Sequence, residues 1–424
     1  MISGIDYRPQ WDYGEDDDYP EGPPDTTSEL SDEDDRDDGE VPYQFKSIIY
    51  AIGRFQNLKR VEVQHDAEVC GPSNEDYQSG NHREWTEYRE QFFEQLINGL
   101  NDEAHPALNL SGLCIENLQD LVNKEIAGSK NFTAVLKMLD TLELGIATES
   151  YSASPENEIT IAERHTFFGR DLVKYWLQPV QDHLVHLKLY CDTYWGYAPI
   201  FNYESLQFPK LKSLALGNFT FFSDRQLDWI LSHGDTLESL SLDDCPILHA
   251  ARVQKPVNAD GSMIYNIDEG LHWDYEGADN FWSYDARWHD YFQRIKNGLQ
   301  KLKHFGIGHG NWQDDYDRDG GSAFVHAPLK KAELDYRRYC IFNCGIGPSQ
   351  WVECRIRGFY DSETGSYEEK DVRYDGAWEE DEGPTPKVPG SWREDKTALD
   401  ELLHKISTGI SAFPALASVT LGDM

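Results

Sequence analysis

The sequence predicts an α/β fold in which a curved parallel sheet carries helices on its outer side. Three observations predict it: a short apolar motif recurs along the chain, amphipathic segments precede several copies, and three consecutive copies are spaced by 27 and 26 residues. A strand and a helix that repeat at this spacing form a leucine-rich repeat. The chain is therefore expected to be an irregular leucine-rich-repeat solenoid, in which each repeat packs only against its neighbours.

The recurring motif places three apolar residues at positions one, four and six. Because the last two are two residues apart, both point to the same face of a strand. A single copy of so common a pattern would mean little, but eight copies predict strands that lie side by side. The copies begin at Leu58, Leu110, Leu139, Leu184, Leu211, Leu237, Leu302 and Leu416.

Helical periodicity marks the residues that precede several strands. Steps of three and four residues put apolar side chains on one face of segments 84–100 and 284–299. Ser223 and Gln226 form a capping box, and Gly234 follows as a helix end. Strands that alternate with helices predict a parallel sheet, with an ordinary α/β sandwich as the alternative fold. Further helices are expected at 163–177 and 397–408.

Composition divides the chain into four regions. Residues 1–42 are expected to be a disordered acidic tail, because the first forty hold sixteen acidic residues against two arginines. Residues 43–312 form the predicted solenoid, interrupted at 249–283 by an insertion rich in Trp and Tyr. Residues 313–395 form a long second insertion, and residues 396–424 form a terminal helix and strand.

The second insertion contains one recognisable local pattern. Residues from Trp351 to Arg357 alternate apolar and charged side chains, and a turn-like segment separates them from Val372 and Tyr374. This pattern predicts a β-hairpin. Segment 376–391 is rich in Glu, Pro and Gly and is expected to be mobile.

Charge and cysteine content restrict the classes of partner and compartment. The formal net charge of −38 repels phosphate backbones and anionic membranes, so neither nucleic acid nor membrane is expected as a partner. The seven cysteines are odd in number, which favours reduced thiols. No secretory signal and no apolar run of about 20 residues is visible, so a cytoplasmic or nuclear protein is expected.

The clearest metal motif is the alternation of Asp315, Asp317 and Asp319 before Gly320, which matches the first half of a calcium loop. The twelfth loop position holds His326 instead of a bidentate Glu. A solvated acidic loop is therefore favoured, with calcium-dependent binding kept as an alternative. Because no common nucleophile, zinc-protease or phosphate-loop motif is present, the sequence predicts a protein without cofactor and without catalytic activity.

A binding surface follows from the repeat prediction. Side chains that flank the paired apolar positions of each strand would line the concave face of the sheet, where repeat proteins often bind other proteins. The centre of this face is small and polar, and loops, insertions or a merely solvated face are alternatives. The predicted protein-binding residues are Arg60, Glu62, Glu143, His186, Lys188, Tyr190, Ser213, Ser239, Ser241 and Asp243.

Several segments resemble one protein family. The sequences FPKLKSLALGNFTF (208–221), QLDWIL (226–231) and LESLSLDDCPIL (237–248) resemble filamentous-fungal F-box and leucine-rich-repeat proteins, as do segments 284–292 and 345–351. The resemblance covers roughly residues 45–350 and the last repeat. It implies a substrate receptor of a cullin-type ubiquitin ligase, in which an F-box binds a Skp adaptor and the repeats select the substrate.

The N-terminal region departs from that family pattern, because no F-box-like start precedes the repeats. A stand-alone repeat scaffold that binds a protein without any ligase is therefore the alternative function. In both versions the partner is a protein, with a Skp adaptor and a cullin added if an F-box is supplied.

Overall fold

The computed structural model describes residues 41–65, 86–149, 159–272, 278–310, 328–344, 350–361, 366–374, 378 and 383–411. Three predictions lie outside the described residues. They concern nearly all of the acidic tail, the calcium-loop residues Asp315, Asp317 and Asp319, and the eighth strand after Leu416.

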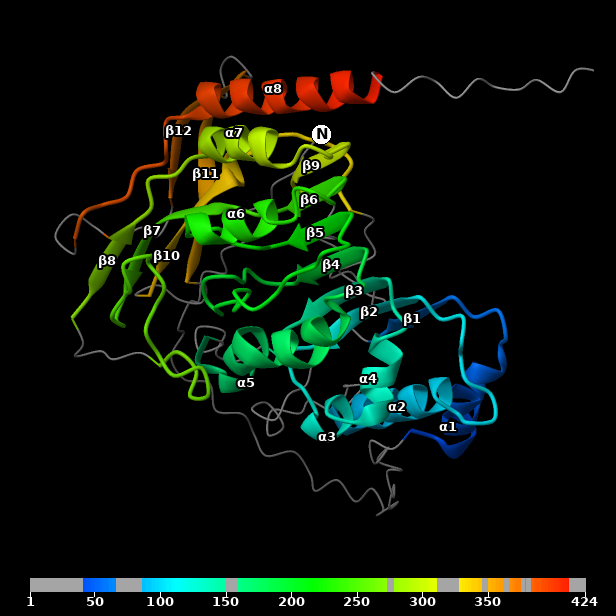
Figure 1. The fold of residues 1–424 in the computed structure, drawn as a ribbon. Helices are drawn as coiled ribbons and strands as arrows, with labels where there is room; N and C mark the ends of the chain where they lie inside the picture. The colour runs from blue at the N-terminus through cyan, green and yellow to red at the C-terminus, as the bar shows by residue number, and fades with distance from the viewer. Residues whose placement is uncertain are drawn as a thin grey trace, which may run out of the picture. The chain divides into compact units, whose positions relative to one another are not determined.

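Seven parallel strands form the larger sheet and follow one another in chain order, β1-β2-β3-β4-β5-β6-β9 (Figure 1). Each contains the paired apolar residues of one predicted motif, so the parallel α/β fold is confirmed. The strands are β1 (Arg60–Gln64), β2 (Gly112–Gln119), β3 (Thr141–Ala147), β4 (His186–Cys191), β5 (Ser213–Gly217), β6 (Ser239–Asp243) and β9 (His304–Gly308).

The same position of the motif begins every strand, so equivalent residues lie next to one another across the sheet. Thr141 pairs with His186, and Ser213 pairs with both His186 and Ser239. Within every strand the second and fourth residues are apolar and buried, as are Leu142 and Leu144 in β3. The alternation in the sequence therefore becomes a sheet with one apolar face.

Helices cover that apolar face (Figure 1). The five predicted helices are present, and α6 has the predicted capping box at Ser223 and Gln226. The helix predicted at 163–177 begins as α5 (Ala162–Thr166), continues as a π-helix (Phe167–Leu177) and ends in a 3₁₀ turn (Gln178–Val180). The other helices are α1 (Tyr43–Tyr50) with the 3₁₀ turn η1 (Ala51–Arg54), α2 (Thr86–Leu100), α3 (Lys124–Ala127), α4 (Lys130–Leu136), α6 (Asp224–Leu231), α7 (Trp288–Gly298) and α8 (Trp392–Ser411). None of the helices described combines the length and apolar character needed to cross a bilayer.

Strands from the two predicted insertions come together in a second sheet, ordered β12-β11-β10-β7-β8. The two insertions are predicted as separate segments, but β7 of the first insertion pairs in parallel with β10 of the second insertion. The hairpin predicted near Trp351 is present as β11 and β12. The strands are β7 (Ile247–Val253), β8 (Asn280–Ser283), β10 (Tyr339–Asn343), β11 (Trp351–Asp361) and β12 (Ser366–Tyr374).

A buried carboxylate joins this second sheet to α7 and α8. Asp395, at the start of α8, is fully buried and accepts hydrogen bonds from the backbone N–H and Nδ1 of His289, at 3.0 and 2.9 Å. It also accepts from Arg338 Nε at 3.1 Å and Tyr339 Oη at 3.0 Å. Ser391 Oγ donates to it at 2.9 Å. One side chain thus fixes the last two long helices against β10.

Candidate functional site

The side chains predicted to line a concave face lie on the face of the larger sheet that the helices leave uncovered. We call it the ladder face, made of the first, third and fifth residues of the seven strands. In-register pairing places Glu62, Cys114, Glu143 and Lys188 in one row across four strands. The structure therefore brings the predicted residues together on one surface.

A long side chain crosses the ladder face near its N-terminal end. Arg60 extends from β1 over Gly112 of β2 and donates from Nη1 to Glu143 on β3 at 3.0 Å. Its Nε donates to Glu62 at 2.6 Å. A Cβ at Gly112 would lie 3.3 Å from Cγ of Arg60, so the glycine leaves room for the crossing. The hydrogen bond to Glu143 raises the pKa of Arg60.

A second crossing lies further along the face. The ring of Tyr190 extends from β4 over Gly217 of β5, and its hydroxyl donates to Asp243 Oδ2 on β6 at 3.3 Å. The backbone N–H of Gly310 donates to Oδ1 of the same carboxylate at 2.7 Å. The Lys188 ammonium lies 4.8 Å from the centre of the Tyr190 ring. Burial and the nearby Asp243 carboxylate raise the pKa of Tyr190.

Exposure divides the ten predicted binding residues into two groups. Four are buried, so a partner cannot contact them without rearrangement: Lys188, Tyr190, Ser241 and Asp243 have exposed fractions of 7%, 0%, 2% and 1%. The others are accessible to different degrees: Arg60, Glu62 and His186 are exposed, whereas Glu143, Ser213 and Ser239 are half-buried. The accessible part of the face is therefore its β1 end and the row of first positions, which also contains His304 at its far end.

The predicted set omits Gly112 and Cys114, although the motif at Leu110 would have placed both on this face. Burial raises the pKa of the Cys114 thiol to about 12. The thiol is therefore protonated near neutral pH and is a poor nucleophile. Cys114 is one of six described cysteines, all of which have free thiols.

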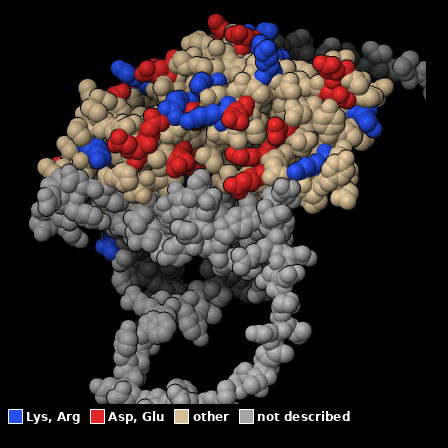
Figure 2. All heavy atoms as spheres, turned by 90° about the horizontal axis from the view of Figure 1, so that it is seen from below, with Lys and Arg blue, Asp and Glu red and all other residues tan. Residues whose placement is uncertain are grey.

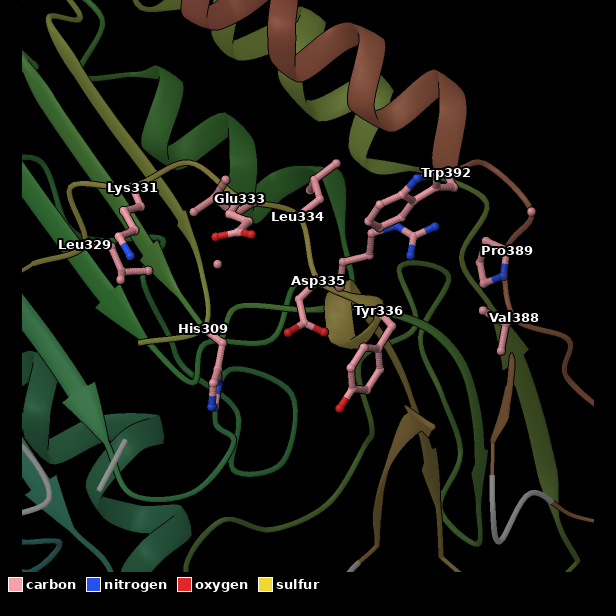
Figure 3. Close-up of a pocket in the computed structure, with 14 residues that line it drawn as sticks. His309, Leu329, Lys331, Glu333, Leu334, Asp335, Tyr336, Val388, Pro389 and Trp392 are labelled. Carbon is pink, nitrogen blue, oxygen red and sulfur yellow. The ribbon is translucent and has the colours of Figure 1, made fainter. Parts of the chain in front are cut away.

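A cavity of about 730 Å³ lies beyond the last strand of the sheet, and the sequence does not predict it. Figure 3 shows the Trp392 and Tyr336 rings, the Glu333 and Asp335 carboxylates and Lys331 around this space. These side chains come from segment 328–338, which follows the edge of β9, and from the start of α8. No local pattern could reveal a wall built from segments so distant in sequence.

The charges around this cavity are largely paired within the protein. His309 contacts Asp244 through Nδ1, and this hydrogen bond raises the pKa of the imidazole. Nη1 of Arg337 lies 3.1 Å from Nε2 of His309, and its Nη2 is 3.0 Å from Asp335. The Arg338 guanidinium lies 4.6 Å from the centre of the Trp392 ring. The cavity is therefore a mixed polar and aromatic site.

Charge elsewhere on the described surface is also mixed. Figure 2 shows acidic and basic side chains interspersed over the described part of the side viewed there. Within the part of the chain that the structure describes, no group of three or more His, Cys, Asp or Glu side chains is arranged to hold a metal ion.

The fold and these sites define the chain as a mixed α/β protein with a seven-stranded parallel sheet. Comparison with known proteins finds no matching family model, no matching characterised protein and no matching solved structure.

Proposed function

We propose that this chain is an irregular leucine-rich-repeat protein that binds another protein, without catalysis, through the accessible part of its ladder face. The observation that carries the proposal is the strand order. Seven parallel strands follow one another in chain order and in register, so equivalent side chains form continuous rows on one face. Such rows are the usual extended binding surface of repeat arrays.

A recurring backbone arrangement supports the repeat interpretation. At each of the six junctions between neighbouring strands, one carbonyl accepts hydrogen bonds from two consecutive backbone N–H groups. Lys59 O accepts from Ser111 and Gly112, and Lys212 O accepts from Glu238 and Ser239. The other four acceptors are Ser111, Asp140, Val185 and Glu238. The strands are spaced irregularly in the sequence, but the same pair of backbone hydrogen bonds joins each strand to the next.

The sixth position, counted from the first residue of three of the strands, adds a second recurring feature. Asn117, Asn218 and Asp244 all follow the fifth strand position and have left-handed φ values of 58°, 55° and 47°. Asn and Asp tolerate this conformation better than most residues. Both asparagines donate from Nδ2 to a carbonyl of the preceding repeat, His65 and Cys191 respectively, at 2.8 Å. Side chains at one repeat position therefore link neighbouring turns.

The hydrogen bonding and protonation of the ladder-face side chains favour binding of a partner over catalysis. The crossing from Arg60 to Glu143 holds polar groups of the accessible part in fixed positions before any partner arrives. A preorganised surface loses less side-chain freedom on binding. The thiol of Cys114, which also lies on this face, is kept protonated by burial.

The proposal is tested by quantitative affinity purification of the tagged full-length protein and two variants. One carries His186→Glu and His304→Glu at the exposed first positions of β4 and β9; the control carries Lys130→Glu and Lys174→Glu on exposed helical sites. We expect a reproducible partner that the ladder-face variant loses and the control retains, with both variants equally stable to heat. Equal retention by both variants would contradict binding through this face.

The narrower role of a cullin-type ligase receptor rests on the family resemblance alone. It predicts that a Skp adaptor and a cullin co-purify with the full-length gene product in its own cells. Partners that are reproducible but include neither subunit would instead favour the stand-alone scaffold. A cytoplasmic or nuclear location is part of both versions, and imaging of the tagged protein tests it.

A further inference from the structure

One histidine links the larger sheet to the turn that leads into the second sheet. His309 directly follows β9, and Asp244 directly follows the neighbouring strand β6. The 3₁₀ turn η6 (Tyr336–Arg338) leads into β10. Nδ1 of His309 contacts the Asp244 carboxylate, and Nε2 lies 3.1 Å from Nη1 of Arg337 in η6. The imidazole therefore connects the ends of two parallel strands with the start of the second sheet.

The two partners determine where the imidazole carries its hydrogen. A carboxylate only accepts hydrogen bonds, so Nδ1 donates to Asp244. A guanidinium only donates, so Nε2 accepts from Arg337 through its lone pair. These contacts describe a neutral imidazole with its hydrogen on Nδ1. An added proton would occupy Nε2, the atom that Arg337 uses as its acceptor.

Charged groups around His309 decide how readily it takes up that proton. Among the described residues they come from the end of β6, the segment along β9, the turn before β10 and strand β11, and they are Asp243, Asp244, Lys331, Glu333, Asp335, Arg337 and Glu353. Figure 3 shows His309, Glu333 and Asp335 around the same space. The hydrogen bond to Asp244 raises the pKa of His309 above its ordinary value of 6.5, although burial and Arg337 oppose the shift.

The hydrogen bonding of Arg337 allows it to leave His309. Its Nη2 donates to Asp335 at 3.0 Å, so only Nη1 depends on the imidazole. Its Nε is buried and has no hydrogen-bond partner among the residues that the structure describes. The Glu353 carboxylate on β11 attracts Arg337 and accepts a hydrogen bond from the Tyr194 hydroxyl at 2.5 Å. Arg337 therefore has a second carboxylate to turn to while it keeps Asp335.

We infer that His309 is a pH-operated joint between the two sheets. The neutral imidazole bridges Asp244 and Arg337. The imidazolium keeps Asp244 but repels Arg337, because Nε2 then carries a hydrogen and the ring a positive charge. Arg337 turns toward Glu353, and the contact between η6 and the end of β9 loosens. Because His309 and Asp335 line the cavity of about 730 Å³, the joint changes one wall of that cavity. This inference does not depend on binding at the ladder face.

Nitrogen-15 NMR of the full-length protein with labelled histidine rings tests the proton positions. The His309 signals are those that His309→Gln lacks. We expect an imidazolium at about pH 5, a neutral ring with its hydrogen on Nδ1 at about pH 9, and a midpoint above about pH 6.5. A neutral ring with its hydrogen on Nε2, or a midpoint at or below about pH 6.5, would overturn the inference.

Two variants test which groups act on the imidazole. Asp244→Asn should lower the pKa of His309 because a carboxylate is lost, and Asn tolerates the φ of 47° at this position. Arg337→Gln should raise it, because a neighbouring positive charge is lost. The control Arg54→Gln, at an exposed site in η1, should leave it unchanged. Shifts of the opposite sign, or an equal shift in the control, would contradict the assigned contacts.

Crystal structures of the protein at about pH 5 and about pH 9 test the movement itself. We expect Nη1 of Arg337 within hydrogen-bond distance of Nε2 of His309 at the higher pH and away from it at the lower pH. In His309→Gln the position of Arg337 should be the same at both. The bond from Arg338 Nε to Asp395, 3.1 Å long, is the internal control and should persist. An Arg337 that stays beside His309 at both pH values would refute the joint.

Discussion

Single glycines allow long polar side chains to lie across the ladder face. At Gly217 an added Cβ would lie only 2.6 Å from Cγ of Tyr190, inside the ring's own space. The aromatic ring is itself fully buried, so it cannot move aside easily. The hydrogen bond from Tyr190 to Asp243 thus depends on the absence of a side chain at Gly217, which lies on the strand between the two partners.

We predict that Gly217→Ala destabilises the protein by about 1–3 kcal/mol, because it overpacks a closed site. Urea unfolding followed by tyrosine and tryptophan fluorescence measures this. Gly390→Ala is the matched control, since nothing lies within 4 Å of a Cβ at that position. Equal stability of the two variants would show that Tyr190 is not held over β5.

A buried carboxyl group at Asp120 makes stability depend on pH. Burial raises its pKa from 3.8 to about 7, although Arg164 opposes the shift. The folded state therefore keeps a proton that the unfolded chain releases above about pH 4. The stabilisation from this group is complete below its unfolded pKa and is lost as pH rises toward 7.

We predict that Asp120→Asn removes this dependence. The amide oxygen can still accept the backbone N–H of Glu149, which lies 3.2 Å from Oδ1 in the native protein. In the native protein the free energy of unfolding should fall by up to about 1.4 kcal/mol per pH unit between the two pKa values because of this group. Urea unfolding from about pH 4 to about pH 8 measures the slope; an unchanged slope in the variant would refute the assignment.

At the scale of elements, the start of α6 shows how a local signal fixes a helix. Gln226 is fully buried, and its Oε1 accepts the N–H groups of Phe222 and Ser223 at 2.7 and 3.2 Å. Its Nε2 donates to the carbonyl of Thr220 at 3.0 Å. The Gln226 side chain therefore forms hydrogen bonds with three backbone groups that have no hydrogen-bond partner within the helix.

Gln226→Met should cost at least about 2 kcal/mol, because it keeps the volume but leaves buried backbone groups unpaired. Ser223→Ala should cost about 1 kcal/mol, the usual effect of losing an N-cap side chain. Chemical denaturation of both variants tests this order. A Met variant that is less destabilised than the Ala variant would contradict the role given to Gln226.

Elements with a strong local pattern could be predicted from the sequence, and those that depend on distant contacts could not. Paired apolar residues predicted all seven parallel strands, and Ser223 with Gln226 predicted the capping box. Helices α1, α3 and α4 were missed because they are short, from four to eight residues. The second sheet was missed because β7 and β10 are joined only by tertiary pairing.

The same limit applies to the candidate site. The alternation of each strand predicted which residues share the ladder face, because that is a property of the strand itself. It could not predict that Tyr190 reaches Asp243 or that both are buried, since this depends on Gly217 between them. It also could not predict the cavity near Trp392, whose walls come from the separate segments 307–309, 329–338 and 388–392.

At the scale of the whole molecule, Asp395 connects the helices α7 and α8, at the β9 end of the seven-stranded sheet, to the second sheet. Its carboxylate is fully buried against the nearly buried guanidinium of Arg338, whose side chain is 7% exposed. Removing one partner of such a pair leaves the other charge buried and uncompensated.

Asp395→Asn should therefore destabilise the protein by about 3–5 kcal/mol and expose α8 to protease before the seven-stranded sheet and its other helices. Glu394→Gln, a change of the same kind at the exposed neighbouring residue, should have little effect. Urea unfolding combined with limited proteolysis measures both. Equal behaviour of the two variants would show that α8 is held mainly by its apolar contacts with α7.

Hydroxyl-radical footprinting of the protein with and without its purified partner tests binding through the ladder face, because it reports the exposure of individual side chains. His186 and His304 lie at exposed first positions of the ladder face, whereas His404 is exposed on α8. The repeat-binding account predicts that the partner protects His186 and His304 from oxidation and leaves His404 unchanged. Protection of His404 with no change at the two ladder-face histidines would contradict it.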